Sequence, residues 1–173
     1  MVDLDLLRRS PLAGATFGTD GPRLVMAEDA FRTLVDVRGR SADVRKVAGG
    51  GAWVWRLGPD WWLVDGPAES TRGLHSELAN RLRDGLGTGC SAVEVSSHRT
   101  TLVLEGADAR NVLGHGCSID LQGVSTGDCV QGKLALAQVA IACTGAAAYR
   151  VYVRASFARY LAAWFTDAAA EYE

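Results

Sequence analysis

The segment from Glu94 to Leu121 constrains the fold most, because it contains several short predicted elements with few residues between them. Its predicted elements are a strand with Val93 and Val95 on one side, a strand with Leu102 and Leu104 on one face, a helix bearing Ala109, Val112 and Leu113, and a last strand at Cys117–Leu121. Gly114 and Gly116 supply the backbone freedom that ends the helix. Short elements that follow one another so closely are typical of the centre of a domain.

The rest of the chain continues this alternation of hairpins and single helices. The predicted elements are a strand at 31–37, a short helix over Val44–Ala48 capped by Ser41, a hairpin at 52–65, an amphipathic helix at 69–84 with Leu74, Leu78 and Leu82, strands within 134–142 and at 148–154, and a helix capped by Ser156 with Phe157, Tyr160, Leu161, Trp164, Phe165 and Ala168 on one stripe. This order predicts an α+β fold with antiparallel sheets and helices packed on one side.

The domain organisation follows from the length of 173 residues and from an irregular start. Residues 1–22 carry repeated Gly and Pro without periodicity, and predict an irregular arm that lies on partner subunits. Residues 23–173 are expected to form one domain with halves at roughly 23–90 and 91–173. The apolar residues of the arm that would contact a partner are Leu6, Leu7, Leu12 and Phe17.

Composition excludes several classes of protein. A net charge of −2 gives no electrostatic reason to expect nucleic acid or an anionic membrane as a partner. No apolar run approaches the roughly 18 residues of a membrane span, and the N-terminus lacks an apolar signal core. We therefore expect a cytoplasmic protein, whose four cysteines are reduced, buried thiols.

Three patterns suggest chemistry, and each has a simpler structural interpretation. His115-x-Cys117 has a poor spacing for zinc, whose ligands usually come in close pairs such as C-x2-C. Ser97 and His98 lie between two strands, where a turn explains them better than a nucleophile does. The glycines of Gly85–Gly89 leave a helix and enter a strand, whereas a phosphate loop leaves a strand and opens a helix. The sequence therefore predicts no catalytic, cofactor-binding or metal-binding residue.

The tryptophans indicate an interface. Trp61 and Trp62 are adjacent in the return strand of the predicted hairpin, so they face opposite ways, and one of them must leave the core. An aromatic side chain outside the core is a candidate interface anchor. Trp164 on the last helix is a further candidate.

Four motifs in order resemble one known family. They are Leu57-Gly58-Pro59-Asp60-x-Trp62-Leu63, Val95-Ser96-x-His98-Arg99-Thr100, Gly116-Cys117-x-Ile119-Asp120-Leu121 and Arg154-x-Ser156-Phe157-Ala158-Arg159-Tyr160-Leu161, with Arg9-Ser10-Pro11-Leu12 at the start. Together they resemble the gamma-subunit family of heterotetrameric sarcosine oxidases over nearly the whole chain. The sequence departs from that family at Gln131-Gly132, where Gln-Thr is expected.

The resemblance implies a fold like that of the aminomethyltransferases of the glycine-cleavage T-protein type, with two pseudo-repeated halves. It implies assembly with alpha, beta and delta subunits, mainly alpha. The complex would oxidise sarcosine with oxygen and water to glycine, formaldehyde and hydrogen peroxide, or make 5,10-methylenetetrahydrofolate from tetrahydrofolate. FAD, FMN, NAD and tetrahydrofolate would lie on the alpha and beta subunits and zinc on delta, leaving a non-catalytic gamma chain. The alternative is a free-standing folate-binding one-carbon transfer protein.

Overall fold

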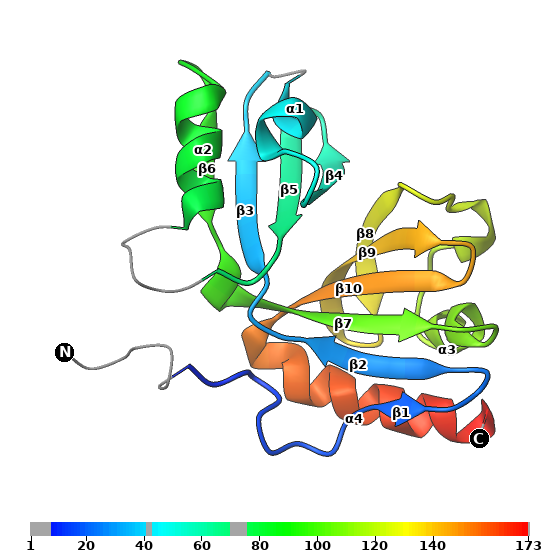
Figure 1. Cartoon of the computed structure of the whole chain (residues 1–173). Helices are drawn as coiled ribbons and strands as arrows, with labels where there is room; N and C mark the ends of the chain where they lie inside the picture. The colour runs from blue at the N-terminus through cyan, green and yellow to red at the C-terminus, as the bar shows by residue number, and fades with distance from the viewer. Residues whose placement is uncertain (1–7, 41–42, 70–75, 173) are drawn as a thin grey trace. The chain divides into compact units, whose positions relative to one another are not determined.

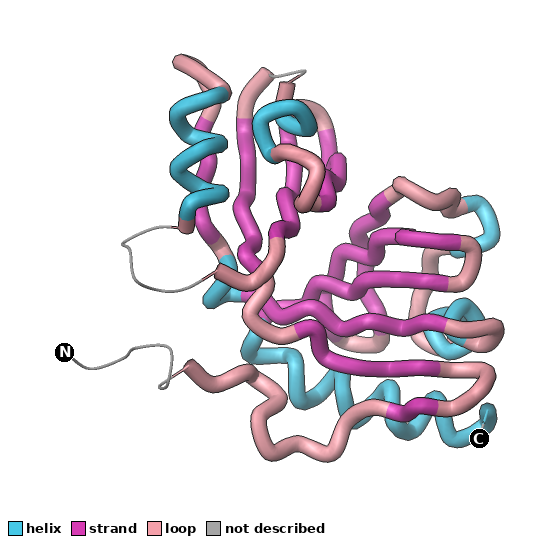
Figure 2. The backbone as a smooth tube through the Cα atoms, in the orientation of Figure 1, coloured by secondary structure: helices cyan, strands magenta, loops and turns pink. Residues whose placement is uncertain are grey.

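The structure, a computed structural model, describes residues 8–40, 43–69 and 76–172. The chain divides into two compact units. The first contains residues 31–97 with the segment that ends at Ser10, and the second contains residues 11–30 and 98–173. Figure 1 labels their elements, and Figure 2 shows which stretches are helix, strand and loop. The first unit extends past the predicted boundary near residue 90, because strand β6 (Ser91–Glu94) pairs with β3 (Thr33–Arg38).

The first unit is an antiparallel sheet with the helices α1 and α2. Its other elements, in chain order, are α1 (Val44–Ala48), β4 (Trp53–Gly58), β5 (Trp61–Gly66), α2 (Glu77–Gly85) and a 3-10 turn at Ser96–His98. The strand order across the described sheet is β4-β5-β3-β6. β4 and β5 form the hairpin that the sequence predicts, and Asp60 in its turn has a positive φ of 52°.

Both helices of the first unit pack on one face of its sheet. Val35 and Val37 of β3 point to that face and pair with Val64 and Trp62 of β5. The other buried members of this cluster are Val44, Ala48, Val54, Leu78, Ala79, Leu82 and Ala92. Because alternate residues of a strand point to opposite sides, the intervening Leu34 and Leu63 are buried on the other face.

The second unit holds the larger sheet. Its elements are β1 (Thr19–Asp20), β2 (Val25–Asp29), β7 (Arg99–Glu105), α3 (Ala109–Gly114), β8 (Cys129–Leu134), β9 (Ala137–Gly145), β10 (Ala148–Arg154) and α4 (Ala158–Ala169), with 3-10 turns at Leu121–Gly123, Ala155–Phe157 and Ala170–Tyr172. The described strands form an antiparallel sheet in the order β1-β2-β7-β10-β9-β8. Within the described residues, no helix is both long and apolar enough to cross a membrane.

Helices α3 and α4 share a core with one face of this sheet. Leu102 and Leu104 of β7 lie on that face, as the sequence predicts, and both are fully buried. They pack with Val112 and Leu113 of α3 and with Phe165 of α4 in one cluster. Fully burying each such side chain stabilises the fold by about 1.5–3 kcal/mol, so this cluster anchors both helices to the sheet.

The pairing confirms the predicted α+β class with antiparallel sheets. It also confirms the turn predicted between the strands of the central segment. Ser96 begins the 3-10 turn, and its hydroxyl accepts the N–H of Leu34 at 3.0 Å and donates to Glu94 at 2.9 Å. The turn is therefore fixed to β3 by a side chain.

The predicted strand at Cys117–Leu121 is wrong. Cys117 forms only an isolated bridge with Leu134, and the chain then enters the 3-10 turn at Leu121–Gly123. The carboxylate of Asp120 accepts the N–H of Gln122 at 2.8 Å. Such side-chain-to-backbone bonds compete with strand pairing, which explains the turn.

The predicted helix at 69–84 begins later than expected. Helix α2 starts at Glu77, with Ser76 as its capping residue. Glu69 lies before the helix, and its carboxylate accepts the N–H groups of Glu77 at 2.6 Å and Leu78 at 3.2 Å. A negative charge at a helix N-terminus is stabilising, so Glu69 acts as an external cap. The predicted residues Ser41 and Leu74 lie outside the described part of the chain.

The last helix also differs from the prediction. Ser156 makes no side-chain cap, and Phe157 occupies the capping position of α4. Phe157 and Tyr160, predicted on the buried stripe, are 42% and 39% exposed. The buried residues of α4 are Ala158, Leu161, Ala162, Phe165 and Ala169. The buried stripe is therefore offset by one residue from the predicted one, and Leu161 and Phe165 belong to both.

Strand β2 does not appear among the predicted elements. It pairs with β7 along its length, and Thr19 and Asp20 of the supposed arm pair with β2 as β1. Only Met26 of β2 is fully buried, so the strand lacks the alternating apolar pattern that identifies strands from sequence. Part of the predicted arm thus belongs to the sheet of the second unit.

A buried carboxylate ties the start of α3 to the segment before β2. The side chain of Asp108 is 3% exposed and accepts bonds from Arg23 Nε at 2.5 Å and Nη2 at 2.9 Å. These hydrogen bonds hold the pKa of Asp108 below its usual value. The carboxylate therefore contributes stability above its unfolded pKa of about 3.9 and loses it as the pH falls through the folded pKa.

Replacing Arg23 with glutamine is expected to destabilise the protein at neutral pH, and this difference from wild type should shrink below about pH 4. Urea midpoints of both proteins at pH 7 and pH 3 measure the effect. The control is Arg83→Gln, which removes an exposed arginine bonded to Asn80. An equal loss from Arg23→Gln at both pH values would contradict the linkage.

Candidate functional site

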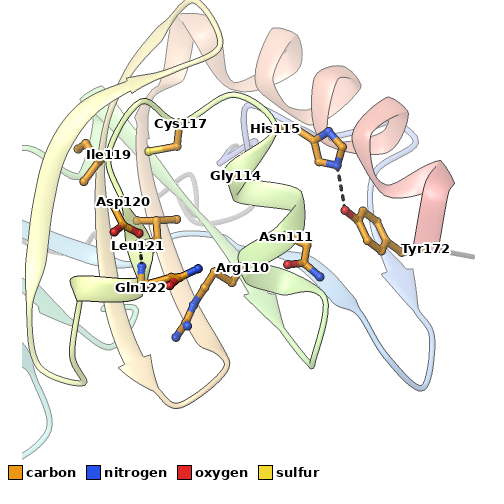
Figure 3. A pocket seen from close by; sticks show the side chains of 10 residues that line it. All are labelled: Arg110, Asn111, Gly114, His115, Cys117, Ile119, Asp120, Leu121, Gln122 and Tyr172. Atoms are coloured by element: carbon orange, nitrogen blue, oxygen red, sulfur yellow. Dashed lines mark hydrogen bonds between the residues drawn. The ribbon is translucent and has the colours of Figure 1, made fainter.

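An open pocket of about 460 Å³ lies in the second unit, where α3 ends and the chain turns toward Leu121–Gly123. It is lined by Arg110, Asn111, Gly114, His115, Cys117, Ile119, Asp120, Leu121, Gln122 and Tyr172. Figure 3 shows Arg110, Asp120 and Gln122 on one side of the pocket and His115 with Tyr172 on the other. Most of these lining residues belong to the segment from Glu94 to Leu121.

Arg110 is held in place by a buried phenol. Its Nε donates to the hydroxyl of Tyr149 at 2.9 Å, and Tyr149 is fully buried in β10. This hydrogen bond is the main reason that the pKa of Arg110 is raised. The guanidinium therefore stays charged and fixed, as a cation beside the carboxylate of Asp120.

The opposite wall joins the end of α3 to the C-terminal 3-10 turn. His115 Nε2 lies 2.9 Å from the hydroxyl of Tyr172, and the two rings meet edge to face with centroids 5.9 Å apart. The carboxylate of Glu171 is 3.7 Å from the same nitrogen. The imidazole thus bonds to a side chain that is far away in sequence.

The cysteines are separate and free. Cys117 is half-buried in the pocket wall, and Cys143 donates to the carbonyl of Gly145 at 3.1 Å. Burial raises the pKa of Cys129 to about 12, so this group is a neutral thiol at physiological pH. Nowhere in the described ranges do three or more His, Cys, Asp or Glu side chains gather as metal ligands.

Ser97 and His98, considered above as a nucleophile and its base, do not face each other across a pocket. Ser97 and His98 are both exposed on the 3-10 turn, whereas the neighbouring Ser96 makes the bonds that hold that turn. His115 and Cys117, which the sequence pattern singled out, both line the pocket. Arg110 and Tyr172 line it too, but no sequence pattern pointed to them. Tyr172 was missed because its contact spans 57 positions.

The arm residues predicted as interface contacts fall into two groups. Leu6 and Leu7 lie outside the described residues. Leu12 is 6% exposed and belongs to the core of the second unit, and Phe17 is half-buried against the same core. The apolar surface of Leu12 is therefore covered within its own chain.

The three predicted interface tryptophans are all half-buried. Trp62 packs against the helix-bearing core of the first unit, and its buried indole N–H has no hydrogen-bond partner among the described residues. Trp61 is on the other face of β5, where its indole donates to Asp36 at 2.8 Å and Arg38 stacks 3.8 Å above its ring. Trp164 lies against the core of the second unit.

Other apolar side chains are more exposed than these. In the described part of the chain they are Phe31, Trp53, Val93, Leu136, Phe157 and Tyr160. Val93 is 56% exposed, and Val95, predicted on the same side of that strand, is half-buried. Trp53 stacks on the buried Trp55 with ring centroids 5.2 Å apart, so one face of that hairpin carries aromatic surface outward.

Comparisons with known proteins agree with the motifs. Residues 28–171 match the model of the family described as "Sarcosine oxidase, gamma subunit family". The sarcosine oxidase subunit gamma of Corynebacterium sp. (strain U-96) is 32% identical, covering 99% of this chain and 95% of the relative. The subunit gamma of an Arthrobacter species is 31% identical over the same shares of the two chains.

Solved structures give the same result for the fold. A chain of the heterotetrameric sarcosine oxidase from Corynebacterium sp. U-96 matches with a TM-score of 0.80 and 28% identity, covering 95% of this chain and 96% of that one. The aminomethyltransferase T of the glycine cleavage system from Bartonella henselae matches with a TM-score of 0.59 over 81% of this chain and 44% of that one. At 14% identity the latter shows the fold alone. From the family match and the full-length relatives, this chain belongs to the sarcosine oxidase gamma subunit family.

Proposed function

We propose that this chain is a non-catalytic structural gamma subunit of a heterotetrameric, flavin-dependent sarcosine oxidase in the cytoplasm. The observation that carries the proposal is the family match over residues 28–171. A similar chain at 28% identity comes from a structure titled as a heterotetrameric sarcosine oxidase, which supports other subunits as partners. We propose that these are alpha, beta and delta, with alpha as the main one.

The reaction of the proposed complex is oxidation of the N-methyl group of sarcosine, giving glycine, formaldehyde and hydrogen peroxide, or 5,10-methylenetetrahydrofolate when tetrahydrofolate is present. FAD, FMN, NAD, tetrahydrofolate and zinc are proposed to lie on the other subunits. The gamma chain would then contribute surface to the assembly. The start of its N-terminal arm would lie on partners, whereas Leu12, Thr19 and Asp20 belong to its own second unit.

The geometry of the pocket supports a non-catalytic role. Three of its polar side chains already have partners: Arg110 bonds to the buried Tyr149, His115 to Tyr172, and the carboxylate of Asp120 to a backbone N–H. A general base or nucleophile needs a free pair of groups aimed at a reacting atom. Bonds of this kind serve to fix the exit of α3.

The test uses the whole complex. We expect Cys117→Ser and His115→Ala to leave turnover per bound flavin within about twofold, while omission of the gamma gene prevents a stable complex from forming. The wild-type complex, purified through the alpha subunit in the same way, is the control. A tenfold loss of turnover in an intact, normally flavinated Cys117→Ser complex would contradict the non-catalytic role.

The aminomethyltransferase likeness keeps a second function open to test, a folate-binding one-carbon transfer protein. This chain covers 44% of that aminomethyltransferase. A folate pocket formed between several domains needs surrounding residues that a chain of this length does not supply. Calorimetric titration of the chain with a reduced folate separates the two functions. Tight binding by the lone chain would favour one-carbon transfer.

We also propose that the two units are pseudo-repeats. Each contains a strand, a helix and then a hairpin, as β3-α1-β4-β5 in the first unit and β7-α3-β8-β9 in the second. After the hairpin they differ, with α2 and β6 in one and β10 and α4 in the other. A superposition that pairs the first four elements in order would support the repeat.

A further inference from the structure

One wall of the pocket at the end of α3 holds a cation with unused donors. Nε of Arg110 donates to the hydroxyl of Tyr149, and its two Nη groups have no hydrogen-bond partner among the described residues. Because Tyr149 is fully buried in the sheet, this bond limits rotation of the guanidinium. A guanidinium held in this way, with both Nη groups unused, presents a fork that matches the two oxygens of a carboxylate.

An unused acceptor lines the same pocket. One carboxylate oxygen of Asp120 accepts the N–H of Gln122 at 2.8 Å, and the other oxygen has no partner in the described part of the chain. Tyr149 is the main cause of the raised pKa of Arg110, and Asp120 contributes to it as well. The two charges therefore act on each other, but no direct ion pair joins these two described side chains. Each is left able to bind a charged group of a ligand.

The balance of charge in this lining selects the class of ligand. Arg110 and Asp120 carry opposite charges on one side of the pocket, and His115 is bonded to Tyr172 on the other (Figure 3). The carboxylate of Glu171, 3.7 Å from the same imidazole, adds negative charge there. A phosphate or a dicarboxylate would be attracted by the arginine but repelled by both carboxylates, and a simple amine would be repelled by the arginine. A zwitterion is attracted by both charged groups.

The size and the remaining lining of the pocket suit a small molecule. Its volume of about 460 Å³ lies in the usual range for such sites. Ile119 is half-buried and Leu121 is 4% exposed, so the lining includes apolar surface. The side-chain amide of Gln122 makes no hydrogen bond with the described residues and adds a donor and an acceptor beside the charged groups. A few polar groups with apolar neighbours are typical of small-ligand sites.

We propose that this pocket binds a small amino acid, whose carboxylate pairs with the Nη groups of Arg110 and whose ammonium group pairs with the unused oxygen of Asp120. Gln122 adds a hydrogen bond, and the aliphatic part of the ligand lies against Ile119 and Leu121. No covalent bond forms or breaks, so the site is compatible with a non-catalytic chain. The inference goes beyond the proposed function, because it concerns this chain by itself.

Titration of the full chain with a matched set of ligands tests the site. Norvaline and δ-aminovalerate carry both charges, valerate carries only the carboxylate, and pentylamine carries only the ammonium group. Amide chemical shifts in heteronuclear NMR spectra of the chain report binding at the pocket. We expect a Kd of about 1 mM for the tighter of the two amino acids, and binding at least tenfold weaker for valerate and pentylamine.

Two substitutions separate the two charges of the site. Arg110→Met is expected to weaken binding of the amino acid at least tenfold. Asp120→Asn keeps an oxygen for the N–H of Gln122 but removes the negative charge, so valerate and the amino acid should then bind within about twofold of each other. The matched control is Arg159→Met, which removes an arginine of the same unit that donates to the carbonyl of Ala13 at 2.9 Å. It should bind the amino acid as wild type does.

Four results would overturn the site. They are unshifted pocket amides with either amino acid at about twenty times the expected Kd, equal binding of valerate and the amino acid to wild type, unchanged binding by Arg110→Met, and an equal loss from Arg159→Met. Urea midpoints show whether each variant is folded. If Arg110→Met is unfolded, Arg110→Lys takes its place, and it should bind severalfold more weakly because it keeps the charge without the fork. Failure of this site leaves the proposed function intact, which fails only if the sarcosine oxidase complex forms without this chain.

Discussion

Replacing Gly106 with alanine is expected to lower the free energy of unfolding by roughly 3 kcal/mol or more, enough to abolish most of the soluble protein. Gly106 lies between β7 and α3 at a φ of 117°, where a Cβ would be 2.2 Å from the backbone oxygen of Arg23. The N–H of Gly106 donates to Ala147 at 2.9 Å, and the N–H of Asp108 donates to the same Arg23 oxygen at 3.2 Å. Neither backbone segment can move away without breaking these bonds.

Gly127 supplies the matched control for this prediction. It also has a positive φ, 96°, but nothing lies within 4 Å of the Cβ that alanine would add. Gly127→Ala should therefore cost only the conformational strain of about 1–2 kcal/mol. Urea unfolding of the full chain, followed by tryptophan fluorescence, measures both. Equal losses from the two substitutions would show that the contact with Arg23 is not the cause.

Replacing Arg32 with methionine is expected to destabilise the first unit by about 3–5 kcal/mol. Arg32 Nε donates to Asp65 at 2.7 Å, and the two side chains are 17% and 0% exposed. Removing the arginine leaves a carboxylate in a buried position without the cation beside it. Because a buried pair is often matched in stability by apolar residues of similar volume, the double variant Arg32→Met/Asp65→Leu should recover most of the loss.

The same sheet offers an exposed pair as the control. Arg38 Nε donates to Asp36 at 3.0 Å, with side chains 55% and 20% exposed. Water screens this pair, so Arg38→Met should cost no more than about 1 kcal/mol. Urea midpoints of the three variants and wild type decide the matter. A loss from Arg32→Met as small as that from Arg38→Met would refute the role of the buried pair.

Elements with local signals could be predicted from the sequence. The hairpin at 52–65, the helix around Val112 and the strand at 148–154 each carry their own turn residues and apolar period, and each is present in the structure. The turn at Ser97 and His98 was predicted for the same reason. These elements depend on residues within a few positions of one another, which a sequence displays directly.

Elements fixed by distant partners could not be predicted in this way. Strand β2 exists because β7 lies beside it, and little of β2 itself is buried. The exposed side of α4 depends on the core against which Leu161 and Phe165 pack, and the members of that core come from distant parts of the chain. In the pocket, His115 and Cys117 were visible as unusual residues, but the bond from His115 to Tyr172 depends on the fold of the whole second unit.

The departure at Gly132 from the threonine expected in the family has a consequence for how this family varies. A Cβ at Gly132 would lie 2.7 Å from Cδ1 of Ile119, so the two positions share one small volume between β8 and the exit of α3. A larger side chain at position 132 therefore fits only if the isoleucine side chain turns away from β8. A family member that has both threonine at this position and the isoleucine should hold that isoleucine in a different rotamer from the one in this chain.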